Sequence, residues 1–163
     1  MLRVLLVCTG NTCRSPMAEA FLRDKIKQSG LEQQIVASSA GIAAGGQYPA
    51  SENACLVMRQ RGLELTGHYS RQLLPEHIMT ADLILTMTDR HKKMVINLVP
   101  AIRHRIYTLA EYALEDGEIA DPYGGSVTVY QACAKQIEKI VDKAWVKIIA
   151  LAGKKDSVEK NDR

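Results

Sequence analysis

Residues 4–15, which read VLLVCTGNTCRS, constrain the fold more than any other part of this 163-residue sequence. The four apolar residues at 4–7 are typical of a buried strand, and Ser15 followed by Pro16 is typical of a helix start. The segment therefore predicts a strand, a turn and a helix in direct succession. Cys8 then stands at the C-terminal end of the strand.

The turn between the strand and the helix has the composition of an anion-binding loop. Gly10 and Asn11 adopt positive φ angles readily, so the chain from Cys8 to Arg14 can curl with its N–H groups inward. The following helix adds unpaired N–H groups and the positive end of its dipole, and Arg14 can clamp two phosphoryl oxygens. Because such a pocket also favours a thiolate, we expect Cys8 to be a low-pKa nucleophile aimed at phosphate.

Two plainer interpretations of this segment remain open. Cys8 could be a small apolar residue that only packs at the strand end, beside an ordinary turn. Cys8 and Cys13 could alternatively bind a metal, but their spacing is not CxxC and no second pair matches them. The joint occurrence of cysteine, turn formers, arginine and a helix start favours the nucleophile.

Apolar runs alternate with helical patterns along the rest of the chain. This alternation predicts an α/β fold: a single domain with a four-stranded parallel twisted sheet and helices on both faces. The expected strands are residues 2–8, 34–38, 82–87 and 106–109, and the expected helices are residues 16–29, 50–61, 89–98 and 126–152. We expect the domain to span 1–152 and the charged tail, 153–163, to be flexible. Cys8 then lies at the carboxyl edge of the sheet, where such folds bind ligands.

The loop motif resembles that of the low-molecular-weight protein tyrosine phosphatase family, which has the form V-C-x-G-N-x-C-R-S-P. A second family element, in which members carry their general acid, is matched by Asp121, Pro122 and Tyr123. The resemblance extends from residue 2 to about residue 152 and implies the family's Rossmann-like fold. It also implies a cysteine-dependent protein phosphatase that needs no metal and no other cofactor.

The resemblance implies a role for each matching residue. Cys8 would form a phosphocysteine, and Asp121 would protonate the leaving group and then activate water. Charge on the transferred group would be stabilised by the loop and the arginine, that is by Thr9, Gly10, Asn11, Thr12, Cys13 and Arg14. The loop itself would be braced by Asn11, Ser15, Ser39 and His68.

Three of these residues have alternative roles. Asp121 could be an ordinary turn residue, since Asp-Pro followed by two glycines is a common loop composition. Ser15 could donate its hydroxyl to the Cys8 thiolate, cap the helix, or do both. Cys13 resembles the family's second loop cysteine, which can form a reversible disulfide with the nucleophile, but it could also be a spectator.

The surroundings of the predicted pocket favour phosphoarginine over phosphotyrosine as the substrate. Tyrosine-type members wall the pocket with aromatic residues, whereas this chain has IAAGGQ at 42–47 and two glycines at 124–125. Bacterial protein arginine phosphatases of the same family share the run C-T-G-N-T-C-R-S-P-M-A-E. We therefore expect substrate choice to depend on Thr12, Ile42 and Tyr123, with a phosphotyrosine-specific enzyme as the alternative.

Other functions are less compatible with the sequence. A net charge of +3 does not indicate nucleic-acid binding, and the apolar run at 4–7 is too short for a membrane span. Thioredoxin-coupled arsenate reductases share the loop but need further cysteines, and residues 80–99 contain none. A non-catalytic phosphate-binding or phosphocysteine carrier module would need no acid at Asp121. We expect a cytoplasmic enzyme that acts on phosphorylated proteins or peptides and releases inorganic phosphate.

Overall fold

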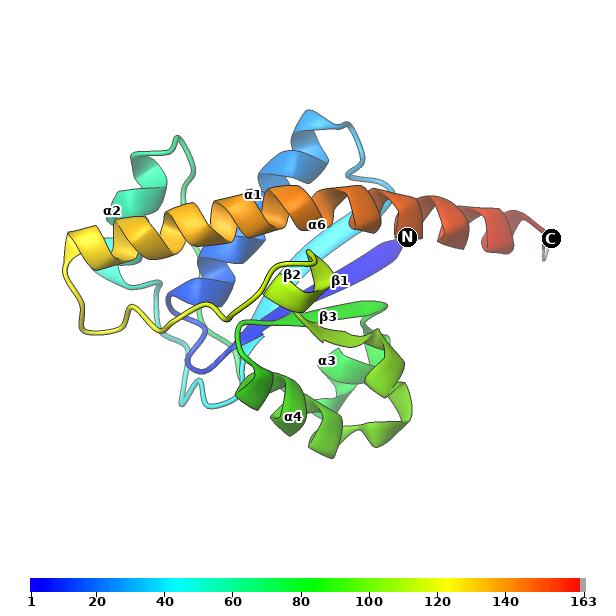
Figure 1. Ribbon diagram of the computed structural model, residues 1–163, viewed down its shortest axis with the longest axis horizontal. Helices are drawn as coiled ribbons and strands as arrows, with labels where there is room; N and C mark the ends of the chain where they lie inside the picture. Colours follow the sequence, from blue (N-terminus) through cyan, green and yellow to red (C-terminus); the bar gives the residue numbers. More distant parts are fainter. Residues whose placement is uncertain (162–163) are drawn as a thin grey trace.

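A parallel β-sheet forms the centre of the molecule in the computed structural model, which describes residues 1–161 (Figure 1). Over these residues the sheet has four strands in the order β2-β1-β3-β4, and every neighbouring pair is parallel. The strands are β1 (Leu2–Cys8), β2 (Ile35–Gly41), β3 (Leu83–Thr86) and β4 (Ile106–Thr108). The predicted fold class is confirmed.

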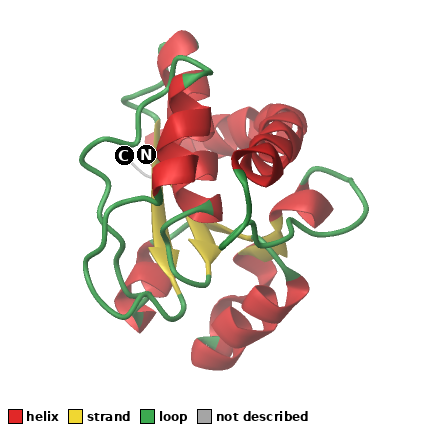
Figure 2. Cartoon of the chain, turned by 90° about the vertical axis from the view of Figure 1, so that its left-hand side faces the viewer, coloured by secondary structure: helices red, strands yellow, loops and turns green. Residues whose placement is uncertain are grey.

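Helices cover both faces of the sheet (Figures 1 and 2). The helical segments are α1 (Arg14–Gln28), α2 (Glu52–Arg59), α3 (Pro75–Thr80), α4 (Asp89–Leu98), η1 (Pro100–Arg105), α5 (Leu109–Tyr112) and α6 (Val127–Asn161). Side chains alternate along β1, so Val4 and Leu6 pack with α1, α2 and α6, whereas Leu5 and Val7 pack with α3 and α4. This alternation explains why β1 reads as a continuous apolar run.

The second strand extends further than predicted. We expected it to end at residue 38, but β2 continues to Gly41 and pairs Ser39 with Leu6 and Gly41 with Cys8. Ser39 therefore lies in the strand and not in the loop after it. The small residues at 38–41 have weak β propensity, but the ladder with β1 holds them extended as far as β1 itself extends.

The short helical segments α3, η1 and α5 were not predicted. Each has four to six residues, too few to produce a recognisable helical period. Proline begins α3 and η1, and a capping box between Thr108 and Glu111 begins α5. Proline and the capping box each start a single short turn of helix, but such a turn is too short to show the apolar periodicity by which a helix is predicted from sequence.

The last helix, α6, is longer than predicted. It passes the expected end at Ala152 and continues through Gly153 to Asn161, because one glycine costs only about 1 kcal/mol in a helix that is already formed. Lys155 on this extension donates to the Asp82 carboxylate at 2.7 Å and to the Met1 carbonyl. The predicted helix end is wrong, and the division into a domain and a flexible tail stays a prediction. Despite this length, no helix among the described residues is apolar enough to span a membrane.

The end of β2 lies directly against the loop that follows β1, and this contact gives a testable prediction. A Cβ on Gly41 would lie 2.5 Å from the Thr9 carbonyl oxygen and 3.0 Å from the Asn11 nitrogen. Because both are backbone atoms, Gly41→Ala should displace the loop. We expect a loss of about 1–3 kcal/mol in the free energy of unfolding, measured in urea, and a clear loss of affinity for inorganic phosphate, measured by calorimetry.

Gly153→Ala is the matched control for Gly41→Ala. Gly153 lies in α6 with no atom within 4 Å of its added Cβ, so this change should leave phosphate affinity unaltered and stability equal or higher. Unchanged phosphate affinity in Gly41→Ala would contradict the prediction.

Candidate active site

The predicted catalytic residues lie together at the carboxyl edge of the sheet. Cys8 is the last residue of β1, Arg14 is the first residue of α1, and Asp121 lies in the segment that leads to α6. One pocket is lined by all three and by five neighbours: Thr9, Gly10, Thr12, Cys13 and Tyr123. The structure therefore brings together residues that are more than a hundred positions apart in the sequence.

The loop backbone turns its carbonyl groups away from this pocket. The accepting carbonyls and their donors are Cys8 with the Ile42 amide, Thr9 with the Ala43 amide, Asn11 with the His68 ring, and Thr12 with the Ser51 amide. In a trans peptide the N–H points opposite to the C=O, so the N–H groups that follow these carbonyls face inward. Since a carbonyl can only accept, His68 Nε2 carries a proton. The loop has the arrangement of an anion-binding nest.

Asn11 holds the curl of the loop in place. Its φ is 57°, in the left-handed region, and its side chain is 0 % exposed. Its amide nitrogen donates to Ser15 Oγ at 2.8 Å and to Ser39 Oγ at 2.9 Å, and its amide oxygen accepts from the Arg71 N–H. Of the two loop residues suited to a positive φ, Asn11 adopts one and Gly10 does not.

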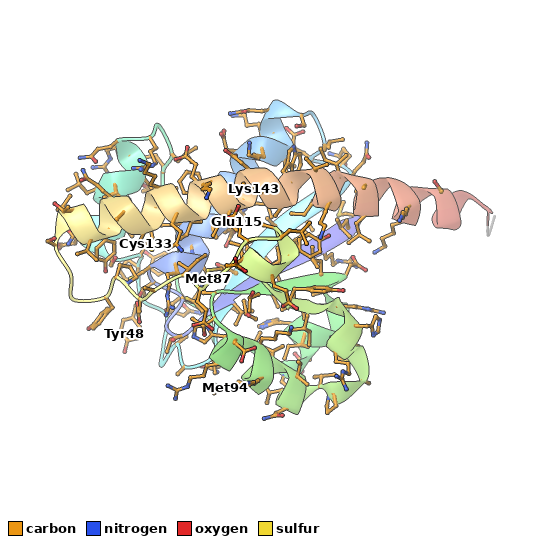
Figure 3. The ribbon with its side chains drawn as sticks, in the orientation of Figure 1. Tyr48, Met87, Met94, Glu115, Cys133 and Lys143 are labelled. Carbon is orange, nitrogen blue, oxygen red and sulfur yellow. The ribbon has the colours of Figure 1, made fainter. Side chains whose placement is uncertain are left out.

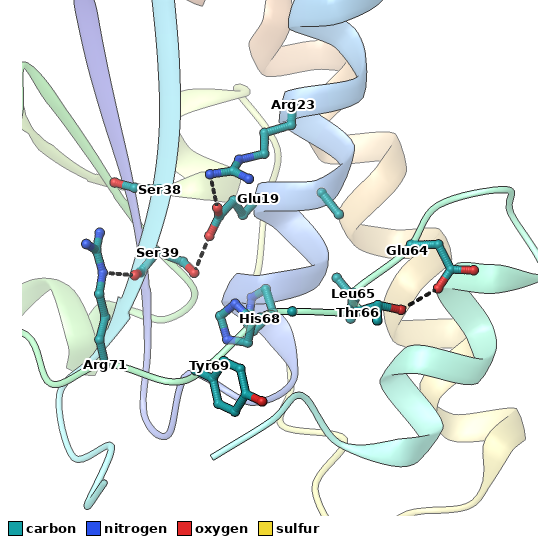
Figure 4. Close-up of a pocket in the computed structure, with 13 residues that line it drawn as sticks. Glu19, Arg23, Ser38, Ser39, Glu64, Leu65, Thr66, His68, Tyr69 and Arg71 are labelled. Carbon is teal, nitrogen blue, oxygen red and sulfur yellow. Dashed lines mark hydrogen bonds and ion pairs between the residues drawn. The ribbon is translucent and has the colours of Figure 1, made fainter. Parts of the chain in front are cut away.

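The support continues behind the loop, where Figure 4 shows a second hollow between α1, β2 and the segment around His68. Ser39 donates its hydroxyl to the Glu19 carboxylate, which is also paired with Arg23 one turn further along α1. Arg71 Nε donates to the Ser39 carbonyl at 2.6 Å. The predicted supporting residues are therefore in contact with the loop, and Ser39 is itself held by the charged side chains of Glu19 and Arg71.

The Cys8 thiol is almost fully buried at the base of the pocket. Its sulfur is 2.9 Å from Ser15 Oγ and accepts from the Asn11 N–H at 3.3 Å. Because Asn11 already donates to the Ser15 oxygen, the Ser15 proton is free to point at the sulfur. The structure thus places Ser15 on the thiol, and its side chain makes no helix-capping bond.

Burial opposes the thiolate. Desolvation raises the pKa of the Cys8 thiol above its ordinary value, although the Ser15 hydroxyl and amide, the Arg14 charge and the Asn11 N–H each lower it. The predicted low pKa is therefore wrong in direction. The sequence shows which donors surround the sulfur but not how completely it is removed from water.

Arg14 is held on three sides with its side chain buried. Nη1 donates to the Ile119 carbonyl at 3.1 Å, and Nη2 lies 3.4 Å from Thr9 Oγ1 and 3.2 Å from Asp121 Oδ2. The Ile119 N–H in turn donates to the carbonyl of Met87, the residue after β3. The end of β3 therefore positions both the arginine and the segment that carries Asp121.

Two of the three predicted specificity residues reach the pocket. Thr12 and Tyr123 line it, and Tyr123 is 79 % exposed. Ile42 is not among the described residues that line the pocket. Its side chain packs against the core cluster that contains Leu5 and Val7. Tyr48 projects from the surface at the same end of the molecule (Figure 3).

Cys13 lies in a small polar cluster next to the loop. Its sulfur is 3.2 Å from Tyr130 Oη and 3.4 Å from Ser51 Oγ, and burial raises the pKa of Tyr130 to about 12. The cysteines of the described chain are all free thiols, so the disulfide between Cys8 and Cys13 stays a prediction. Over residues 1–161 no group of three His, Cys, Asp or Glu side chains is placed to hold a metal ion.

One residue beside the pocket was missed by the sequence analysis. His91, in the first turn of α4, places its Nε2 2.8 Å from Thr9 Oγ1. One signal was available in the sequence: His91 follows Thr88 by three residues, and Thr88 lies just after β3, at the carboxyl edge of the sheet where the site is expected. A histidine in an otherwise polar stretch, HKK, gives no sign that it is buried.

Replacing Ser15 tests the electrostatics of the thiol. Ser15→Ala removes a donor to the sulfur, so the pKa of Cys8 should rise further. The pH dependence of alkylation of Cys8 by iodoacetamide measures this shift. Ser157→Ala, which removes an exposed hydroxyl on α6, is the control and should leave the profile unchanged. An unchanged or lower pKa in Ser15→Ala would show that the Ser15 hydroxyl does not stabilise the thiolate.

Comparison with known proteins identifies relatives along almost the whole chain. The family model described as low molecular weight phosphotyrosine protein phosphatase matches residues 3–156. A protein-arginine-phosphatase of Geobacillus stearothermophilus is 41% identical over 147 residues, which cover 90% of this chain and 95% of that protein.

Solved structures give the same result for the fold. A low molecular weight protein tyrosine phosphatase from T. tengcongensis superposes with a TM-score of 0.86 at 37% identity, covering 90% of this chain and 99% of that one. A YwlE arginine phosphatase in which a phosphorylated serine replaces the active-site cysteine superposes with a TM-score of 0.82 at 32% identity. That comparison covers 94% of this chain and 95% of the other.

Proposed function

This chain belongs to the low molecular weight phosphotyrosine protein phosphatase family, and from that premise we propose that it hydrolyses phosphorylated protein side chains, phosphoarginine in preference to phosphotyrosine. The observation that carries the proposal is the pocket that Cys8, Arg14 and Asp121 share at the inward-facing loop. A nucleophile, a fixed cation and a carboxyl group there face one volume that fits a phosphoryl group.

The reaction begins with attack of the Cys8 sulfur on phosphorus. The S–P bond forms as the P–N or P–O bond to the substrate breaks, and Asp121 gives its proton to the departing atom. The loop N–H groups and Arg14 stabilise the charge on the three equatorial oxygens. Ser15 and the Asn11 N–H stabilise the sulfur anion as it forms, which offsets part of the effect of burial.

The second half of the reaction regenerates the enzyme. Asp121, now a carboxylate, takes a proton from a water molecule that attacks the phosphocysteine. The S–P bond breaks, inorganic phosphate leaves, and the sulfur keeps the electron pair. The ion pair between Asp121 and Arg14, at 3.2 Å, competes with phosphate for the guanidinium, so substrate binding releases the carboxyl group toward the leaving atom.

Phosphoarginine is the favoured substrate for two reasons. Tyr123 is the aromatic residue among those that line the pocket, and it is mostly exposed, so a phenyl ring would find little wall to stack on. Asp121 can pair with the guanidinium of the leaving group, and Thr12 offers its hydroxyl at the pocket wall. The Geobacillus relative, a protein-arginine-phosphatase, supports this choice.

Phosphotyrosine is the second candidate, and the T. tengcongensis structure and the description of the family support it. With either substrate the partners are phosphorylated proteins or peptides. We place the enzyme in the cytoplasm because a nucleophilic thiol needs a reducing environment to stay active.

A pair of peptides of identical sequence, one bearing phosphoarginine and one phosphotyrosine, tests the substrate. We expect kcat/KM for phosphate release to be higher with phosphoarginine. Thr12→Val, which removes the hydroxyl and keeps the shape, should lower the phosphoarginine value about tenfold while changing hydrolysis of para-nitrophenyl phosphate far less. Faster release from phosphotyrosine would contradict the preference and leave the phosphatase assignment intact.

Substitution of the nucleophile and the acid tests the mechanism. Cys8→Ser should abolish turnover while phosphate binding persists, and mass spectrometry should detect any phosphoserine that forms, as in the YwlE variant. Asp121→Asn should slow turnover by about a hundredfold or more and let phosphoenzyme accumulate. If the protein were a phosphocysteine carrier, Asp121→Asn would leave formation of the phosphocysteine unchanged. If it were an arsenate reductase, it would reduce arsenate in the presence of thioredoxin.

A further inference from the structure

His91 is a buried titratable side chain that the mechanism above does not use. It is 5 % exposed, and its ring reaches from α4 to the exposed Thr9 side chain at the mouth of the pocket. Thr88 caps α4 by accepting from the His91 N–H, which fixes the backbone from which the ring projects. The capped first turn of α4 therefore fixes the position of the ring, and the ring contacts Thr9 of the loop that follows β1.

One order of donors and acceptors fits both contacts of Thr9. Arg14 can only donate, so Thr9 Oγ1 accepts from Arg14 Nη2 at 3.4 Å. The Thr9 hydroxyl keeps its own proton, and His91 Nε2 lies 2.8 Å away, where an unprotonated nitrogen accepts it. A neutral imidazole with this acceptor carries its proton on Nδ1.

The charge of the ring agrees with this order. The pKa of His91 is lowered to about 4, chiefly by burial; the charges of Arg14 and Arg90 lower it as well, whereas those of Asp121 and Glu118 raise it. The imidazole is therefore neutral at pH 7 and can accept a proton at Nε2.

The ring makes this contact at a cost. Among the described residues, His91 Nδ1 is the buried side-chain polar atom that has no hydrogen-bond partner. An apolar side chain would fill the same space without an unpaired polar atom, so packing alone does not explain a histidine here. The contact with Thr9 does.

We propose that His91 is a positioning residue for the phosphatase reaction: it holds the Thr9 hydroxyl so that the oxygen lone pairs face Arg14 and keep the guanidinium directed into the pocket. The inference rests on the proposed function, because Arg14 is the group that binds the phosphoryl oxygens. Ile119 and Asp121 hold the same guanidinium from other directions. In the proposed mechanism phosphate displaces Asp121, and the contact from His91 through Thr9 then supports the guanidinium together with Ile119.

The tautomer of His91 tests the proposal without any substitution. Nitrogen-15 NMR of the wild-type protein at pH 7 should show a neutral ring with Nε2 unprotonated and Nδ1 protonated. A ring protonated at Nε2 would make His91 the donor to Thr9, and this result would overturn the proposal.

Four variants test the consequence for phosphate binding: His91→Leu, Thr9→Val, the double substitution and His91→Gln. His91→Leu and Thr9→Val should each weaken binding of inorganic phosphate about five- to tenfold, the effect of one hydrogen bond to a charged group. The double variant should be no worse than the single ones, because both break the same chain of contacts. His91→Gln, whose amide oxygen can accept, should stay within about twofold of wild type.

A structural control separates positioning from stability. Val95→Ala, in the core cluster with Leu5 and Ile78 on the buried face of α4, should lower the melting temperature and leave phosphate affinity unchanged. Full phosphate affinity in His91→Leu, additive losses in the double variant, or an equal loss in Val95→Ala would each overturn the proposal. These measurements need no turnover, so an enzyme inactive on both phosphopeptides would refute the proposed function while the role of His91 is still decided.

Discussion

The left-handed conformation of Asn11 and the three hydrogen bonds of its side chain are the constraint on which the site depends. A positive φ at this residue costs roughly 1–3 kcal/mol and persists where the surroundings hold it. Here the surroundings are Ser15 on α1, Ser39 on β2 and the Arg71 amide. Because three separate segments contribute, the curl of the loop exists only in the folded protein.

The curl then organises the charges of the pocket. It turns backbone N–H groups inward, places Asn11 N–H on the Cys8 sulfur and starts α1 at Arg14. Removing the thiol and the guanidinium from water is unfavourable by itself, and the same contacts that orient the two groups offset part of that cost. Orientation and desolvation are therefore consequences of one backbone conformation.

Much of the architecture was predictable from the chain. The boundaries of β1 and α4 were correct to the residue, because a continuous apolar run and a capped amphipathic segment have strong local patterns. The end of β2, the short helices and the length of α6 were not predictable from local patterns. Pairing with β1 decides where β2 ends, caps and prolines start the short helices, and α6 continues because the helix is already formed. The sequence named the residues that line the pocket but also Ile42, whose side chain turns to the core.

By itself, the sequence determined the chemistry that the loop can offer: a cysteine, a turn, an arginine and a helix start within twelve positions, with an acid motif far downstream. The tertiary structure alone decided that burial raises the pKa of the thiol, that Ser15 faces the sulfur, and that His91 contacts Thr9 across 82 positions. Local spacing determines which groups a segment carries. Solvent exclusion and contacts between distant elements arise only when the strands are aligned in one sheet and the helices pack against it.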